Sequence, residues 1–137
     1  MKRIVPALIV FTTLLLYSCS ADTGPVEEEP GTPSGTDNPV SFSQEVQPVF
    51  DQNCTSCHPS SGNLDLTAAN SYSSLVNVPA SGYSAVRVVP GDPESSVLYG
   101  KINGSNTFGS NMPLGGSLSA AQIDIIKRWI EQGAEDN

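Results

Sequence analysis

Histidine, methionine, cysteine and basic residues are all scarce in this chain of 137 residues. Six lysines and arginines stand against fourteen aspartates and glutamates, which gives a formal net charge of −8. This balance excludes nucleic acid as a natural partner, because phosphate binding needs clustered lysine and arginine. One histidine and three cysteines, of which two lie in the expected folded part, are also too few for a four-ligand zinc site there.

The chain has one long apolar run, at residues 4–16, and this run is shorter than the roughly 20 residues that span a membrane. Because two basic residues precede the run, we interpret residues 1–18 as an export signal. The run ends in Leu16-Tyr17-Ser18-Cys19, which resembles the lipobox of bacterial lipoproteins. This resemblance implies that Cys19 becomes the lipidated first residue of the mature protein. An ordinary signal peptide and an uncleaved anchor are the alternatives.

Residues 19–39 contain almost no large apolar side chain. Proline, glycine, serine, threonine and acidic residues dominate this segment, with Val26 as the exception. Such a composition cannot bury enough apolar surface to fold, so we predict a disordered linker with a reach on the order of 25 Å. One small domain then remains at residues 40–137. We therefore expect an exported protein that is lipid-anchored in a bacterial envelope.

Hydrophobic periodicity predicts an all-α domain with long loops rich in glycine and proline, because no strand alternation and no internal repeat is visible. A first helix is expected from Ser41 or Ser43 to about His58. A second helix is expected to begin with Asp92 as N-cap and to end at Asn103-Gly104. The residues expected to face inward are Phe42, Val46, Val49, Phe50, Cys54 and Cys57 in the first helix, and Val97, Leu98 and Ile102 in the second.

The last helix has the clearest signals. Ser119 and Gln122 have the spacing of a capping box, and Leu118 can pack on Ile123. Gly133 is a plausible C-terminal cap. The apolar stripe of this helix consists of Ile123, Ile126, Trp129 and Ile130.

Two cysteines and the only histidine of the chain fall within five residues. Cys54-Thr55-Ser56-Cys57-His58 has the C-x-x-C-H spacing that attaches a c-type haem. On a helix, positions i, i+3 and i+4 share a face, so both thiols can form thioethers with the haem vinyl groups while His58 binds the iron. Phe50, one turn before Cys54, would flank the ring. The motif therefore predicts one covalent haem c, with iron as the metal.

Other interpretations of the cysteine pair explain less of the sequence. A thioredoxin-like redox pair requires a βαβ context, and none is visible. A structural disulfide between Cys54 and Cys57 would leave His58 without a role. Haem attachment explains all three residues together.

Met112 is the only methionine besides the initiator, and it lies in a polar loop flanked by glycines. Such a loop offers little core for a methionine to fill, and its glycines let the backbone approach a flat cofactor closely. We therefore predict that Met112 is the sixth ligand of the iron. An open coordination site, or Lys101 as a weak substitute, are the alternatives.

The order of these motifs resembles class I cytochromes c, and more narrowly the haem domains called planctomycete-type cytochrome c. The resemblance covers roughly residues 42–134. The matching stretches are Val46-Gln47-Pro48-Val49-Phe50, Cys54-Thr55-Ser56-Cys57-His58, Gly62-Asn63-Leu64-Asp65-Leu66, Arg87-Val88-Val89-Pro90-Gly91-Asp92-Pro93, Ser96-Val97-Leu98-Tyr99, Met112-Pro113 and residues 126–134.

The resemblance implies a class I cytochrome c fold in which His58 is the proximal and Met112 the distal ligand of the iron. It also implies that the first and last helices pack together, with Phe50 and Trp129 as aromatic contacts. As a lone cation in an acidic domain, Arg87 is expected either to face a haem propionate or to be a solvated surface residue.

One residue departs from the resemblance, because Pro59 stands where many relatives have glycine. The backbone carbonyl that accepts the ring N–H of His58 is therefore left open. With both axial positions occupied, we expect a one-electron carrier and no catalysis. The acidic surface predicts a redox partner with a basic docking patch, and we expect a monomer. The alternatives are an enzyme or gas sensor with a labile sixth site, and an electron-entry module of a partner dehydrogenase.

Overall fold

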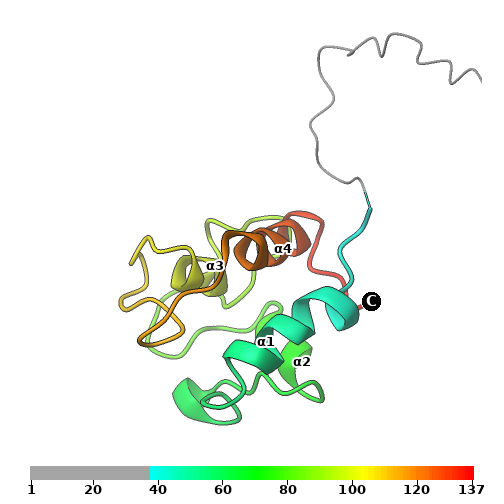
Figure 1. The fold of residues 1–137 in the computed structure, drawn as a ribbon. Helices are drawn as coiled ribbons and strands as arrows, with labels where there is room; N and C mark the ends of the chain where they lie inside the picture. Colours follow the sequence, from blue (N-terminus) through cyan, green and yellow to red (C-terminus); the bar gives the residue numbers. More distant parts are fainter. Residues whose placement is uncertain (1–37) are drawn as a thin grey trace, which may run out of the picture. The chain divides into compact units, whose positions relative to one another are not determined.

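The computed structural model describes residues 38–137, so the predicted export signal, Cys19 and most of the predicted linker lie outside the described residues. The elements are the π-helix η1 (Phe42–Val46), α1 (Gln47–Asn53), the 3-10 helix η2 (Ser61–Asn63), α2 (Ser71–Leu75), α3 (Val97–Ile102) and α4 (Ala120–Glu131), shown in Figure 1. This part of the chain has isolated bridges but no strand, in agreement with the predicted all-α class. None of its helices is long and apolar enough to cross a membrane.

The first predicted helix begins where expected, with Ser41 as N-cap. The hydroxyl oxygen of Ser41 accepts the N–H of Gln44 at 3.3 Å, and a carboxylate oxygen of Glu45 accepts the N–H of Ser41 at 2.9 Å. These reciprocal bonds satisfy N–H groups that have no partner inside the helix. Pro48 lies in the first turn of α1, where its missing N–H costs no helical bond.

The same helix ends earlier than predicted, at Asn53 rather than near His58. Asn53 and Thr55 donate side-chain hydrogen bonds to carbonyls of the last helical turn, at 2.8 and 3.0 Å. Pro59 further disfavours a helical conformation at His58, the residue that precedes it. Residues 54–60 therefore form hydrogen-bonded turns, and the prediction of one continuous helix through the C-x-x-C-H motif is wrong.

The second predicted helix, α3, begins at Val97 rather than after Asp92. Asp92 caps a turn instead, because its side chain accepts the N–H of Ser95 at 3.0 Å. The hydroxyl of Ser96 is fully buried; it donates to the carbonyl of Asp92 at 2.7 Å and accepts the N–H of Val89 at 2.8 Å. These bonds fix Ser96, which is the N-cap residue of α3 by position and makes no side-chain bond to the first turn of the helix. The predicted end at Asn103-Gly104 is confirmed.

The last helix, α4, matches its prediction at both ends. Ser119 and Gln122 form the predicted capping box. At the other end, the N–H of Gly133 bonds to the carbonyl of Ile130 at 3.0 Å, and the N–H of Ala134 bonds to that of Trp129 at 2.8 Å. This is a Schellman motif, with Gly133 in the left-handed region at φ 105°.

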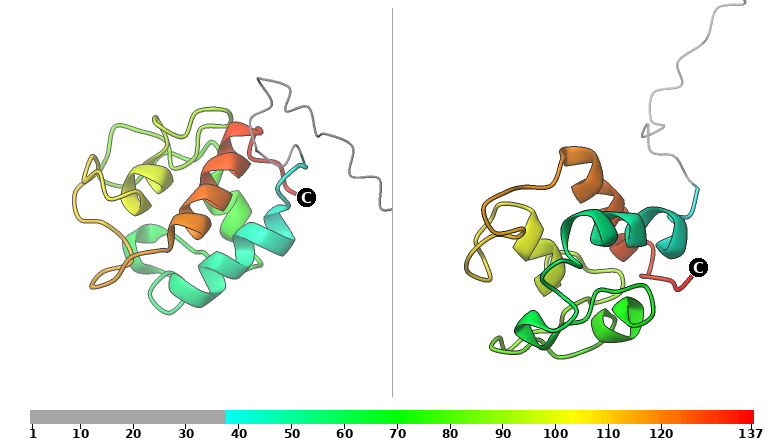
Figure 2. Two further views of the ribbon diagram at one scale, coloured as in Figure 1. Left: turned by 45° about the horizontal axis from the view of Figure 1, so that its top comes forward. Right: turned by 60° about the horizontal axis from the view of Figure 1, so that its bottom comes forward.

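The core lies where η1 packs on α4, which Figure 2 shows side by side. The ring of Phe42 stands between three other rings, with centroid distances of 5.0 Å to Trp129, 5.3 Å to Tyr72 and 6.3 Å to Phe50. The packing of the first helix on the last is therefore as predicted, but the ring that meets Trp129 is Phe42 rather than Phe50. The buried apolar residues of the core are Val40, Phe42, Val46, Val49, Phe50, Leu66, Leu75, Val88, Ile102, Leu118, Ile126, Trp129, Ile130 and Ala134.

A buried polar network joins α1 to α2, the short helix that sequence periodicity did not predict. Ser71 donates to the amide oxygen of Gln47 at 2.6 Å. The amide nitrogen of Gln47 donates to the carbonyl of Leu66 at 3.1 Å and to a carboxylate oxygen of Asp51 at 2.8 Å. Ser71 is fully buried and Gln47 is 6% exposed, so neither side chain can exchange these bonds for water.

Replacing Ser71 with alanine is expected to lower the free energy of unfolding by about 1–3 kcal/mol, because the buried amide oxygen of Gln47 then lacks a donor. Urea unfolding followed by circular dichroism measures the change. Ser73→Ala is the matched control, since the exposed Ser73 hydroxyl also donates to a carbonyl, that of Asn70 at 3.0 Å. Equal stability of the two variants would contradict the role of the network.

Candidate cofactor pocket

An apolar pocket opens between the turns that follow α1 and the helix α3. It encloses about 900 Å³ of space free of protein atoms, part of it open to solvent. Apolar residues form most of the wall, and the lining residues are Cys54, His58, Gly62, Leu64, Leu66, Leu75, Ala80, Ser81, Tyr83, Arg87, Val97, Leu98, Lys101, Ile102 and Met112.

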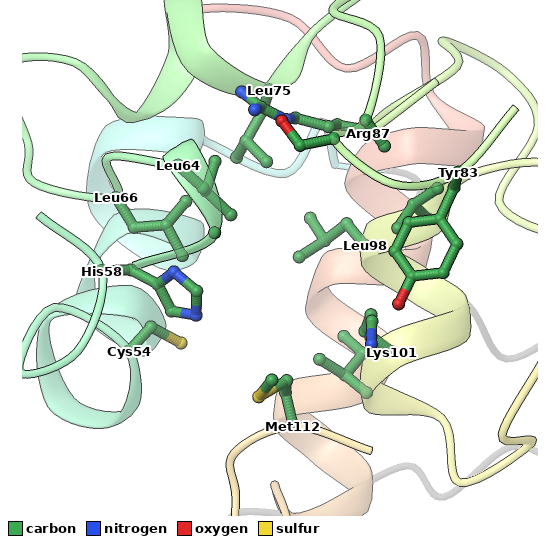
Figure 3. Close-up of a pocket in the computed structure, with 15 residues that line it drawn as sticks. Cys54, His58, Leu64, Leu66, Leu75, Tyr83, Arg87, Leu98, Lys101 and Met112 are labelled. Atoms are coloured by element: carbon green, nitrogen blue, oxygen red, sulfur yellow. The ribbon is translucent and has the colours of Figure 1, made fainter. Parts of the chain in front are cut away.

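Figure 3 shows how the predicted site residues lie around this pocket. His58 and Cys54 come from one wall, with Leu64 and Leu66 above them. Met112 closes the pocket at the end nearest to His58 and Cys54. Arg87 lies at the opposite end, so polar groups mark the two ends of an otherwise apolar space.

His58 is held in one orientation by a backbone carbonyl. Its Nδ1 lies 2.8 Å from the carbonyl oxygen of Ser61, and a carbonyl can only accept, so Nδ1 carries the proton. In the neutral form of the ring, this hydrogen bond leaves the free lone pair on Nε2, where it is available to bind a metal. Gly62 makes this turn possible, because its φ of 66° lies in the left-handed region and the chain folds back beside the ring. The carbonyl of Ser61 is therefore the hydrogen-bond acceptor that the sequence left open.

The two domain cysteines occupy different surroundings. Cys54 is half-buried and lines the pocket, whereas Cys57 is exposed and is not among the lining residues. Burial, and secondarily the neighbouring Cys57, raise the pKa of the Cys54 thiol to about 11. Both cysteines are free thiols in the structure. Because Cys54 is almost wholly protonated at neutral pH, it is a weak nucleophile, which argues against a thioredoxin-like redox role.

Met112 reaches the pocket from the long loop that follows α3. Its N–H donates to the carbonyl of Lys101 at 2.7 Å, which ties the loop to the end of α3. The side chain of Met112 lines the pocket and does not belong to the buried core. Fifty-three residues separate Met112 from His58 in the chain, so the fold, and not local sequence, brings the thioether and the imidazole to one cavity.

Arg87 is buried, with 8% of its surface exposed, so the alternative of a solvated surface residue is wrong. Its guanidinium donates to the carbonyls of Ser74 and Asn63, each at 2.7 Å. Within residues 38–137 it has no carboxylate within ion-pair distance. Burying a cation without a counter-ion costs free energy, because the charge loses its hydration. An anionic group in the pocket would therefore stabilise this end of the site.

The pocket wall differs from the sequence analysis at Tyr83, for which no role was predicted, and at Phe50, which is missing from the wall; Lys101 was predicted only as a weak substitute ligand. Tyr83 and Lys101 stand on the wall opposite His58, from a loop and from α3. Phe50, which was expected to flank the ring, is 1% exposed and belongs to the core instead. Lys101 lies on the same face of α3 as Leu98, three residues earlier, so helical spacing alone could have placed it here.

Within the described residues 38–137, no three histidine, cysteine, aspartate or glutamate side chains gather as a group that could hold a metal ion. A metal in the pocket would therefore depend on ligands of another kind, such as the thioether of Met112. Comparison of the chain with protein-family models, with curated proteins and with solved structures found no match in any of the three.

Proposed function

We propose that this chain is a monohaem c-type cytochrome that carries single electrons in the bacterial envelope, tethered to a membrane through a lipid on Cys19. The proposal rests on the arrangement of side chains around one pocket. Cys54, His58 and Met112 converge at one end of an apolar cavity, and the buried Arg87 lies at the other. A flat, largely apolar macrocycle with carboxylate substituents has the chemistry that this cavity accommodates.

The chemistry of the ligands supports iron in a haem. His58 presents a neutral imidazole nitrogen whose direction is set by the bond from Nδ1 to the carbonyl of Ser61. Met112 supplies a soft, uncharged thioether, which favours the reduced state of haem iron. Bound haem iron supplies a one-electron couple between Fe(II) and Fe(III). His58 and Met112 both lie in segments held by backbone hydrogen bonds, so we expect little structural reorganisation on electron transfer.

Arg87 would hold the polar edge of the haem. Its guanidinium keeps two hydrogen bonds to backbone carbonyls, which leave it further N–H groups for a propionate. This pairing would supply the counter-ion that the buried charge lacks among the described residues. The cysteines would fix the other edge through thioethers, Cys54 from within the pocket and Cys57 from the turn beside it.

A carrier role follows from the proposed occupation of both axial positions, because no position is then left for a substrate. The excess of acidic residues supports a redox partner with a basic docking patch, and association rates that fall with added salt. We propose that the protein acts as a monomer. A labile sixth site would instead make it an enzyme subunit or a gas sensor.

The full chain, produced in a host with haem-maturation machinery, tests the proposal through its visible spectrum. A sharp c-type spectrum in the reduced state, and a weak far-red sulfur–iron band in the oxidised state, are expected. A haem spectrum without that band, together with ready binding of carbon monoxide, would favour the enzyme or sensor. Protein that contains no haem after production in competent cells would refute the proposal.

A further inference from the structure

We propose that Tyr83 is a positioning residue: together with Phe108 and Lys101 it holds the loop of Met112 against α3 and keeps the thioether in place. This inference rests on the proposed function, in which Met112 binds the haem iron. It adds a residue that is neither a cysteine nor a proposed iron ligand; Tyr83 lines the pocket and is bonded to the loop that carries Met112. We call the three side chains of Tyr83, Lys101 and Phe108 the loop clamp.

The loop has little else to hold it. It runs from residue 103 to residue 117, and none of its side chains is buried. It also contains no charged residue, so no salt bridge can fasten it from within. A segment with few buried contacts opens at low free-energy cost. The position of Met112 therefore depends on the contacts that the loop makes with its neighbours.

Tyr83 makes the first of these contacts. Its hydroxyl donates a hydrogen bond of 2.6 Å to the carbonyl oxygen of Phe108. The two rings also meet edge to face, with a centroid distance of 5.6 Å and an interplanar angle of 78°. Tyr83 thus holds both the backbone and the side chain of Phe108, four residues before Met112.

Phe108 in turn rests directly on α3. A Cβ atom at Gly100 would lie 2.5 Å from Cδ2 of Phe108, so the ring occupies the space that any larger residue at this position would need. Glycine at position 100 therefore allows the Phe108 ring to touch the helix backbone. The loop therefore packs on α3, the helix that forms one wall of the pocket.

Lys101 completes the clamp from the same helix. Its ammonium donates to the carbonyl of Ser110 at 3.2 Å and lies 5.2 Å from the centroid of the Tyr83 ring. Its own carbonyl accepts the N–H of Met112 at 2.7 Å. Residue 108 is thus bonded to Tyr83, and residues 110 and 112 are both bonded to Lys101 of α3. Loss of the Tyr83 hydrogen bond should weaken the two contacts of the loop with Lys101. Met112 should then leave the iron more often.

Tyr83→Phe removes the hydroxyl and keeps the ring, so it breaks one contact of the clamp without emptying the pocket wall. Tyr72→Phe is the matched control, because its hydroxyl also donates to a backbone carbonyl, that of Ala134 at 3.1 Å, but within the core. Titration of the oxidised full-length holoprotein with imidazole reports how often Met112 leaves the iron. The apparent affinity for imidazole is proportional to that fraction.

We expect imidazole to bind Tyr83→Phe about three- to tenfold more tightly than the wild type, as the loss of one hydrogen bond predicts. Tyr72→Phe should bind imidazole like the wild type, even where it lowers the thermal midpoint of unfolding. Equal affinities of wild type and Tyr83→Phe would overturn the role of the clamp.

Hydrogen exchange of the Met112 amide separates failure of the clamp from failure of the haem proposal, because it needs no iron. The amide should exchange faster in Tyr83→Phe than in Tyr72→Phe, by a factor similar to that in the imidazole titration. Unchanged exchange would reject the clamp whether or not haem is bound. Faster exchange in protein that lacks haem would support the clamp and reject only the proposed function.

Discussion

Replacing Met112 with alanine is expected to abolish the far-red band of the oxidised holoprotein while leaving the haem covalently attached. Met112 is the only thioether that lines the pocket, and the attachment motif lies in another segment of the chain. The variant should bind carbon monoxide readily in the reduced state, because no side chain then occupies the sixth position. Its reduction potential should fall, since a thioether ligand favours Fe(II). Optical spectra and a redox titration measure all three effects.

Leu114→Ala provides the control for the same loop. Leu114 lies two residues beyond Met112, and 73% of its surface is exposed, so its loss should change neither the band nor binding of carbon monoxide. A far-red band that survives in Met112→Ala would show that the thioether is not the ligand. If the band is lost but carbon monoxide does not bind readily, Lys101, which also lines the pocket, would be the next residue to replace.

The second large effect is expected in the core, where replacing Trp129 with alanine should cost about 3–5 kcal/mol of the free energy of unfolding. Trp129 is 1% exposed, packs against Phe42 with the two rings tilted by 37°, and donates from Nε1 to the carbonyl of Glu135 at 2.8 Å. Its removal leaves a cavity at the contact between η1 and α4. A loss of this size is a large fraction of the roughly 5–15 kcal/mol that stabilises a domain.

Urea unfolding of the holoprotein, followed by circular dichroism, measures this loss. Leu114→Ala again serves as the reference, since truncation of an exposed side chain should change the stability by no more than about 0.5 kcal/mol. If Trp129→Ala unfolded at the urea concentration of the wild type, the contact of η1 with α4 would not be the core of the domain.

The helices could be predicted where their signals are local. The capping box at Ser119 and the glycine at position 133 define α4 in sequence, and both are observed. The end of α1 and the start of α3 were missed because they depend on side chains that bond to backbone groups, as Asn53 and Ser96 do. The five-residue helix α2 has too few turns to produce a periodic pattern.

The site could be predicted in part, again because some of its signals are local in the sequence. Residues 54–58 form a local motif, and the scarcity of methionine indicated Met112. The carbonyl that orients His58 could not be predicted, since it depends on a turn at Gly62 rather than on a motif. The contact of Tyr83 with Phe108 joins two loops that are remote in sequence, and no pattern within either loop indicates it.

The four cations of the described part have different surroundings. On α4, Lys127 and Arg128 pair with Glu131 and Asp124 at 2.9 and 3.1 Å. Arg87 and Lys101 instead line the pocket, where no carboxylate joins them among residues 38–137. The lining of the pocket is thus opposite in sign to the formal net charge of −8 of the chain. An anionic group is therefore attracted into the pocket even though the chain as a whole repels anions.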